Sequence, residues 1–210
     1  MGFGQIVILN GAPRAGKSSI VKVLQSMPGP PWMNIGVDVF SAWVTPPQYR
    51  PGMGLRPGRE RPEIQALIPA LFAAVYDSIA AHSRQGLNVV ADIEHHDAYA
   101  VPLGLLPACA RRLNGLPALF VGVRCPLDVI VDRRDATWPG WRDGLPTVMT
   151  PHGDVPEPAV RWQEEVHRPG IYDLEVDTST MSPEQCAAMI VDRLRDGPLP
   201  TALQQLAAIE

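Results

Sequence analysis

Apolar residues in this chain gather into short runs that alternate with longer segments in which they recur every three or four positions. A short apolar run is typical of a buried parallel strand, and the wider spacing is typical of an amphipathic helix. The predicted strands are residues 5–9, 32–37, 87–91, 116–123 and 172–176. The predicted helices are residues 17–26, 63–84, 101–114, about 126–135 and 159–167, with a last one that opens at Ser182-Pro183. This alternation predicts an α/β fold, with a parallel sheet between two layers of helices.

Two segments rich in proline and glycine interrupt the alternation. The first, at about residues 40–62, carries five prolines, and the second lies at about residues 136–158. Long connections of this kind are usually functional. We expect the first to be a loop on the substrate side of a site and the second to act as a lid. Residues 1–196 are then predicted to form a single domain, and residues 197–210 an appended C-terminal tail.

The segment Gly11–Ser18 fills every fixed position of the phosphate-binding loop G-x-x-x-x-G-K-[ST] and joins the first predicted strand to the first helix. Glycine lets the backbone curl around an anion, and the helix dipole favours negative charge at the same place. Lys17 is predicted to reach the β- and γ-phosphates, and the Ser18 hydroxyl to hold Mg²⁺. A chance glycine-rich turn is the alternative. The predicted nucleotide-binding residues are Gly11, Ala12, Pro13, Arg14, Ala15, Gly16, Lys17, Ser18 and Ser19.

Composition narrows the class of protein. The 210 residues carry a formal net charge of −4, which offers no general basic field, so we expect no nucleic-acid partner. No apolar run approaches the roughly 18 residues of a membrane span, so we expect no membrane partner. Cys109, Cys125 and Cys186 are scattered without a C-x-x-C pair, which is typical of reduced thiols in a cytoplasmic protein.

Further short motifs follow the phosphate-binding loop along most of the chain. They are Ile8–Gly11 leading into Ala15–Val21, then Gly36-Val37-Asp38, Val121–Cys125, Val166-His167 and Tyr172–Thr178. In this order the set resembles the chloramphenicol phosphotransferase family. The resemblance implies an ATP-dependent kinase that phosphorylates an alcohol on a small molecule. It also implies the architecture of shikimate and nucleotide kinases, a P-loop kinase-like three-layer sandwich whose five-stranded parallel sheet has the order 2-3-1-4-5.

Two aspartates are expected at the carboxyl ends of strands, the edge at which open α/β sheets bind ligands. Asp38 is a candidate general base for the attacking hydroxyl, and the resemblance implies this role for the aspartate of its Gly-Val-Asp motif. The alternative for Asp38 is a helix cap. Asp92 ends the third predicted strand, where a Walker B-type carboxylate would hold Mg²⁺ together with Ser18. The alternative for Asp92 is a turn residue.

Three arginines, Arg133, Arg134 and Arg142, lie beside or within the predicted lid. Small-molecule kinases carry cations there that spread charge off the transferring phosphoryl group, and we expect Arg133 or Arg134 to take this catalytic role. The next candidates for this role are Arg14, Arg124 and Arg161. The alternative is an ion pair of Arg133 or Arg134 with Asp132 or Asp135.

Two other groups of side chains have open interpretations. The run Glu94-His95-His96-Asp97 matches no metal-ligand spacing, so we expect solvated or substrate-contacting loop residues there. Four aromatic residues of the irregular segments are either walls for an apolar ligand or packing residues. They are Trp43, Tyr49, Trp138 and Trp141.

The leading prediction is transfer of phosphate from ATP to a hydroxyl of a small molecule, with antibiotic inactivation as its most specific form. Lys17, Asp38, Arg133 and Arg134 are the predicted catalytic residues. One alternative is a metabolic kinase for a nucleoside or a sugar-like alcohol. Another is a non-catalytic regulatory module that binds a nucleotide. A GTPase would need an Asn-Lys-x-Asp stretch, which this sequence lacks.

Overall fold

A central sheet of five parallel strands organises the protein in a computed structural model that describes residues 2–50, 62–99, 101–138, 140–142, 144–151 and 153–209. The strands lie in the order β2-β3-β1-β4-β7. Their bounds are Ile6–Asn10 (β1), Trp32–Asn34 (β2), Asn88–Ile93 (β3), Ala118–Arg124 (β4) and Leu174–Asp177 (β7). Counted along the chain, these five strands have the predicted order 2-3-1-4-5, so the fold prediction is confirmed.

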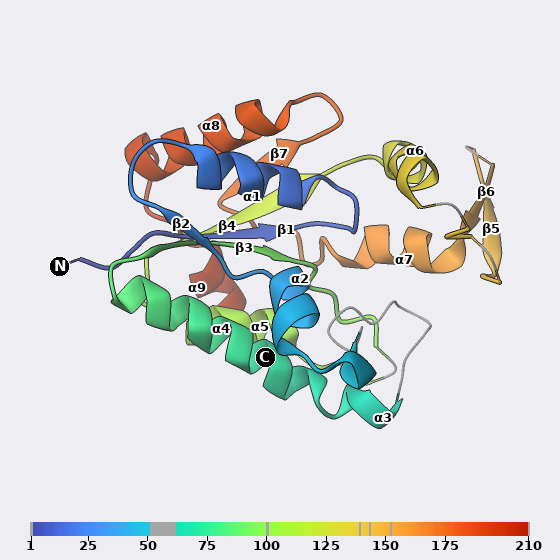
Figure 1. Ribbon diagram of the computed structural model, residues 1–210, viewed down its shortest axis with the longest axis horizontal. Coiled ribbons are helices and arrows are strands. Elements are labelled where there is room, and N and C mark those ends of the chain that lie inside the picture. The colour runs from blue at the N-terminus through green and yellow to red at the C-terminus, as the bar shows by residue number, and fades with distance from the viewer. Residues whose placement is uncertain are drawn as a thin grey trace.

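Helices cover both faces of the sheet because alternate residues of a strand point to opposite faces. Val7 and Leu9 of β1 pack with α1 and α8 on one face, whereas Ile6 and Ile8 pack with α4, α5 and α9 on the other. The two layers are visible above and below the sheet in Figure 1. The covering helices are α1 (Lys17–Ser26), α4 (Ile68–Arg84), α5 (Leu105–Arg112), α8 (Pro183–Asp196) and α9 (Ala202–Ala207).

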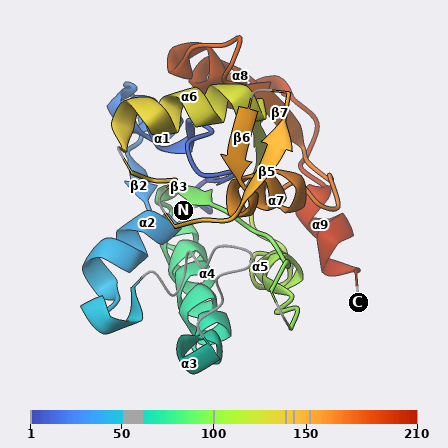
Figure 2. The ribbon, with the colours of Figure 1, turned by 90° about the vertical axis from the view of Figure 1, so that its right-hand side faces the viewer.

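Shorter elements gather toward the end of the sheet at which β1 leads into α1 (Figures 1 and 2). An antiparallel hairpin of β5 and β6 lies there beside α6 and α7. These elements are α2 (Val37–Val39), the π-helix η1 (Phe40–Val44), the 3₁₀ helix η2 (Pro47–Tyr49), α3 (Pro62–Gln65), α6 (Leu127–Thr137), β5 (Thr147–Thr150), β6 (Gly153–Pro156) and α7 (Glu157–Glu165).

Some element boundaries differ from the predicted ones. The second strand ends at Asn34 rather than at residue 37, because the chain turns at Gly36 and begins α2 at Val37. The predicted helix 63–84 is divided into α3 and α4, and Pro69 lies in the first turn of α4 instead of at a kink. Proline is tolerated in a first turn because its missing N–H would have no partner within the helix there.

The predicted lid and tail contain packed elements. In the lid, Val155 of β6 packs against Val131, Trp141 and Ala159. Near the C-terminus, α9 buries apolar side chains in the same core as α5, so this part of the predicted tail is built into the fold. Residues 51–61 of the predicted substrate-side loop lie outside the described residues, as do residues 139, 143 and 152 of the lid.

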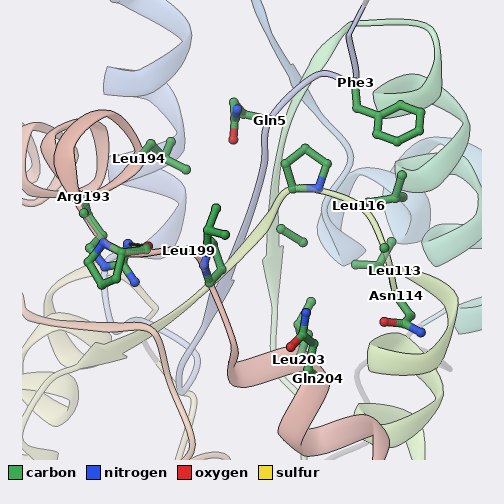
Figure 3. A pocket seen from close by; sticks show the side chains of 16 residues that line it. Phe3, Gln5, Leu113, Asn114, Leu116, Arg193, Leu194, Leu199, Leu203 and Gln204 are labelled. Atoms are coloured by element: carbon green, nitrogen blue, oxygen red, sulfur yellow. Dashed lines mark hydrogen bonds between the residues drawn. The ribbon is translucent and has the colours of Figure 1, made fainter.

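A hollow of about 520 Å³ lies at the opposite end of the sheet, where β1 and β4 begin. Phe3, Leu116 and Leu199 line it, together with Arg193 at the end of α8 (Figure 3). Because the phosphate-binding loop follows the other end of β1, this hollow is separate from the candidate active site. Among the described residues, no helix combines the length and the apolar character needed to cross a membrane.

Candidate active site

The phosphate-binding loop leaves β1 at Asn10 and leads into α1 at Lys17, as predicted. Gly16 occupies the N-cap of α1 with φ of +96°, a left-handed conformation that glycine adopts without strain. A Cβ at Gly11 would lie 2.5 Å from the carbonyl oxygen of Val123, so the close approach of β4 requires glycine. The loop thus ends at the N-terminus of a ten-residue helix, where backbone N–H groups and the helix dipole favour phosphate.

Lys17 is buried against this loop, with 5% of its surface exposed. Its Nζ donates to the carbonyl oxygens of Gly11 at 2.8 Å and Ala12 at 2.9 Å, and it lies 3.0 Å from Oε1 of Glu94. An ammonium group has three N–H donors, and these contacts use all three. The positive charge therefore lies between the loop and the end of β3, within reach of phosphates bound to the loop.

Ser18 and Asp92 meet at the same end of the sheet, since Ser18 Oγ donates to Asp92 Oδ2 at 2.8 Å. Asp92 lies within β3 rather than in a turn. Its other oxygen, Oδ1, is buried and has no hydrogen-bond partner among the described residues. A Cβ at Gly36 would lie 1.7 Å from Oδ1, so glycine there makes room for the carboxylate. A hydroxyl and a carboxylate with an unused oxygen fit the oxygen ligands that Mg²⁺ prefers.

Asp38 is the second residue of α2, and Gly36 rather than Asp38 occupies the N-cap of that helix. The pKa of Asp38 is raised above its ordinary value, chiefly by partial desolvation and then by the negative charge of Asp92. The positive charges of Lys17 and Arg14 oppose this shift. The Asp38 carboxyl group is therefore close enough to Asp92 and to Lys17 and Arg14 of the phosphate-binding loop for their charges to act on it.

The segment that follows β3 differs from the expectation of solvated loop residues. Glu94 is mostly buried as the partner of Lys17, and desolvation raises its pKa although Lys17 opposes the shift. His95 and His96 are 1% and 6% exposed. His95 Nε2 lies 2.8 Å from the Tyr76 hydroxyl, and His96 stacks on Tyr99 at 4.5 Å between ring centroids. The expectation of solvated side chains is therefore wrong for both histidines, because neighbouring helices and loops cover them.

Sequence reasoning missed a buried network that joins the end of β1 to its neighbours. Asn10 Nδ2 donates to the carbonyl oxygen of Val166 at 2.7 Å and to the Tyr172 hydroxyl at 3.0 Å. Asn10 Oδ1 accepts the backbone N–H of His95 at 2.8 Å. His167 Nδ1 lies 2.9 Å from the same Tyr172 hydroxyl. The network fixes the segments that flank the phosphate-binding loop. The advance signal was that Asn10, Val166, His167 and Tyr172 all belong to the short motifs of the sequence, although spacing did not show that they meet.

Of the predicted lid arginines, Arg133 is the one whose described contacts reach the phosphate-binding loop. It donates to the carbonyl oxygens of Arg14 at 3.2 Å and Thr178 at 2.7 Å, and to the Thr178 hydroxyl at 3.1 Å. These bonds join α6 to the loop and to the segment after β7. The guanidinium is therefore placed beside the candidate nucleotide site.

Arg134 and Arg142 instead hold the lid together. Arg134 is buried with its guanidinium 4.9 Å from the Trp141 ring, and Arg142 lies at the same distance from that ring. Arg142 also forms an ion pair with Asp135 at 2.7 Å and donates to the Asp154 carbonyl oxygen at 2.6 Å. In the described contacts Asp135 thus pairs with Arg142, whereas the alternative for Arg133 and Arg134 was an ion pair with Asp132 or Asp135.

The next three arginines and the aromatic residues lie in different environments. Arg124 pairs with Glu175, and Arg14 has a φ of +70° within the loop. Arg161 lies on the exposed side of α7.

The aromatic residues of the irregular segments differ in exposure. Trp141 is a packing residue of the lid, whereas Trp43 is 85% exposed on η1, shortly after Asp38. Tyr49 and Trp138 are partly exposed, at 37% and 42%.

The phosphate-binding loop follows the central strand of a parallel sheet with the order 2-3-1-4-5, and Ser18 and Asp92 are paired beside it. These features define a P-loop kinase-like protein. Comparison with known families agrees with this class. Residues 4–195 match the family described as chloramphenicol phosphotransferase-like protein, and the chain belongs to that family. The resemblance noted in the sequence is therefore confirmed.

Individual relatives agree with the family and the fold. The chain is 26% identical over 225 residues to "Putative O-phosphotransferase Rv2636" of Mycobacterium tuberculosis, covering 97% of this chain and 88% of that protein. The M. tuberculosis APS kinase CysC, solved with AMPPNP and APS, has a TM-score of 0.60 at 15% identity and matches 93% of this chain and all of its own. The Deinococcus radiodurans tunicamycin resistance protein has a TM-score of 0.56 at 18% identity, with 94% and 98% covered. Both structures support the fold.

Proposed function

We propose that this protein transfers the γ-phosphoryl group of ATP to a hydroxyl group of a small molecule. The observation that carries the proposal is the meeting of three features at one sheet edge. These are the buried Lys17 ammonium, the Ser18–Asp92 pair with its unused carboxylate oxygen, and the Asp38 carboxyl group, on which the charges of Asp92 and Lys17 act. Membership of a phosphotransferase-like family supports the same reaction, and P-loop kinases use ATP as the donor.

On this proposal the loop binds the triphosphate through residues 11–19, and Lys17 offsets negative charge on the β- and γ-phosphates. Ser18 and Asp92 would hold Mg²⁺, and their fit rests on the buried Oδ1 of Asp92. When bound, the ion neutralises charge on the phosphate oxygens. Phosphoryl transfer has a loosely bonded transition state, so positioning and charge account for most of its catalysis.

Asp38 is proposed to orient the acceptor hydroxyl and to take its proton as the new oxygen–phosphorus bond forms. The charges of Asp92 and Lys17 act on Asp38. This supports the proposal that the Asp38 carboxyl group lies close to phosphates bound at the loop. Arg133 is proposed as the lid cation that acts on the transferring group, because its guanidinium lies against the loop at Arg14. Arg134, also predicted as catalytic, is proposed to act indirectly through its contact with Trp141.

The acceptor is proposed to be a small-molecule alcohol, and inactivation of a chloramphenicol-type antibiotic is the most specific form. The family description supports this form. Trp43, exposed on η1 shortly after Asp38, offers an apolar ring to such a molecule. Nucleosides and sugar-like alcohols are the competing acceptors.

A panel of alcohols that includes chloramphenicol, nucleosides and sugars should be incubated with ATP and Mg²⁺, and the products read by mass for an added phosphoryl group. The Lys17→Ala variant should abolish transfer to the acceptor that reacts. Lys22→Ala is the matched control, because Lys22 is the other lysine of the chain and is exposed on α1. Full turnover by Lys17→Ala, or activity that survives excess EDTA, would contradict the proposal. ATP binding without transfer to any alcohol would instead support a regulatory module.

A further inference from the structure

Glu94 is the acidic partner of the phosphate-loop lysine, and none of the roles proposed above uses it. Its Oε1 lies 3.0 Å from Lys17 Nζ, with side-chain exposures of 19% for Glu94 and 6% for Lys17. The other two N–H groups of Lys17 are bonded to loop carbonyl oxygens. A lysine that turns toward incoming phosphates must therefore give up at least one of these three contacts.

The backbone on both sides of Glu94 is held firmly. If Lys17 exchanges Glu94 for phosphate, the side chains of Lys17 and Glu94 therefore move and the backbone does not. Ile93 lies in register with Asn10 of β1. The N–H of His95 is bonded to Asn10 Oδ1, and the His95 ring contacts the Tyr76 hydroxyl. Both neighbours of Glu94 are therefore fixed in the core, whereas its own carboxylate is partly exposed at the site.

Of the three contacts of Lys17, the one with Glu94 is the one that phosphate most readily replaces. Gly11 and Ala12 belong to the loop itself, and their carbonyl oxygens stay beside Lys17 as long as the loop keeps its shape. Glu94 follows another strand, β3, and its carboxylate pairs with the Lys17 ammonium as a phosphate oxygen also would. Asp38 and Asp92 add negative charge around Glu94, so Lys17 is its main electrostatic support. Tyr99 is a further titratable neighbour.

We propose that Glu94 is the resident counter-ion of Lys17 and that the phosphates of ATP displace it, so that Glu94 lowers the affinity for ATP. The inference rests on the proposed function, because it assigns the displacing anion to the nucleotide of that reaction. In the free protein Glu94 neutralises a buried ammonium and keeps it oriented. With nucleotide bound, the released carboxylate lies beside the triphosphate and repels it. Glu94 is thus a positioning residue that acts through Lys17.

Binding of the non-hydrolysable analogue AMPPNP with Mg²⁺, measured by calorimetry, tests this inference. Glu94→Gln keeps the size of the side chain and removes its charge. We expect it to bind the analogue about tenfold more tightly, because no ion pair is broken and no carboxylate faces the phosphates. In turnover, KM for ATP should fall, with kcat changed by less than a few-fold. Glu165→Gln is the matched control, since Glu165 is 21% exposed in an ion pair with Arg168, and it should change neither quantity.

A second measurement keeps the inference testable if Glu94→Gln does not fold. In a structure of the unaltered protein with AMPPNP and Mg²⁺, Lys17 Nζ should contact the phosphates, and the Glu94 carboxylate should have left it. A Lys17–Glu94 contact kept near 3.0 Å with nucleotide bound would overturn the inference. So would unchanged or weaker binding by a folded Glu94→Gln variant, or a loss of kcat without a change in KM. If the wild-type protein binds no ATP, the proposed function and this inference fail together.

Discussion

At Asp38, the position within a helix separates a chemical role from a structural one. The residue is second in α2, where a negative charge is favoured by the helix dipole, but the N-cap is Gly36. We predict that Asp38→Asn lowers kcat by about 10²-fold or more, the range of a lost general base, while ATP affinity stays within a few-fold. Single-turnover transfer and ATP titration measure the two quantities.

Asp128 supplies a control for the helix position itself, because it is the second residue of α6, as Asp38 is of α2. Asp128→Asn should leave transfer unchanged. The pH profile adds a separate check. Because the pKa of Asp38 is raised, the base takes up its proton at a higher pH than an ordinary aspartate, and kcat/KM should fall as the pH drops through that value. A normal transfer rate in a destabilised Asp38→Asn variant would contradict the general-base role.

Helix α6 connects the lid to the nucleotide site, and Arg133 on this helix and Arg142 in the lid after it have different contacts. Arg133 bonds to the loop at Arg14, whereas Arg142 pairs with Asp135 within the lid. We predict that Arg133→Ala lowers kcat by about 10²-fold with little change in ATP affinity, because a cation on the transferring group acts mainly in the transition state. Arg142→Ala should cost less than tenfold in kcat. Equal effects of the two substitutions in steady-state kinetics would show that Arg133 has no special role.

The segment after β3 makes the stability of the protein sensitive to acid. Burial lowers the pKa of His95 from 6.5 to about 3, so the folded protein holds this ring neutral while the unfolded chain protonates it. The stabilisation is complete above about pH 6.5 and is lost as the pH falls toward 3. Between pH 7 and pH 5 the loss should be about 2 kcal/mol in the free energy of unfolding.

Denaturant unfolding of the wild type and of His95→Gln at both pH values measures this contribution. The variant has no titrating ring, so its free energy of unfolding should depend less on pH by about the same 2 kcal/mol. His82→Gln is the control, because His82 is a half-buried histidine of α4, outside the segment after β3. An identical pH dependence in the wild type and His95→Gln would contradict the prediction.

For the whole molecule, motifs formed by residues adjacent in the sequence could be predicted, whereas contacts between residues far apart in the sequence could not. The phosphate-binding loop and its flanking elements are contiguous, so spacing was enough to place them. The sheet order came from the resemblance, since local spacing does not determine which strands pair. The Lys17–Glu94 contact joins residues 77 positions apart, and the bond from Asn10 to Val166 spans 156. Such contacts follow only once the spatial neighbours of β1 are known.

Predictions made from residue type alone were also wrong where packing determined whether a side chain is buried. His95 and His96 are polar and follow a strand, which favours a solvated loop, yet aromatic rings on α4, α7 and the loop itself enclose them. Residues 197–210 are predicted as an appended tail, yet α9 buries apolar side chains in the core. Its apolar residues at 202, 203 and 206 show helical spacing, which was the available signal.

The packing of α9 gives a prediction for the stability of the whole fold. Leu206 is fully buried against the core that also holds α5, whereas Leu199, in the connection before α9, is 87% exposed. Leu206→Ala should lower the free energy of unfolding by about 2–5 kcal/mol, since it removes buried methyl groups and leaves a cavity. Leu199→Ala should change it by no more than about 0.5 kcal/mol. Denaturant unfolding measures both, and transfer by the folded fraction of either variant should match the wild type because α9 packs on the face of the sheet opposite to α1, into which the phosphate loop leads. Equal stabilities of the two variants would mean that the C-terminal segment is a dispensable tail after all.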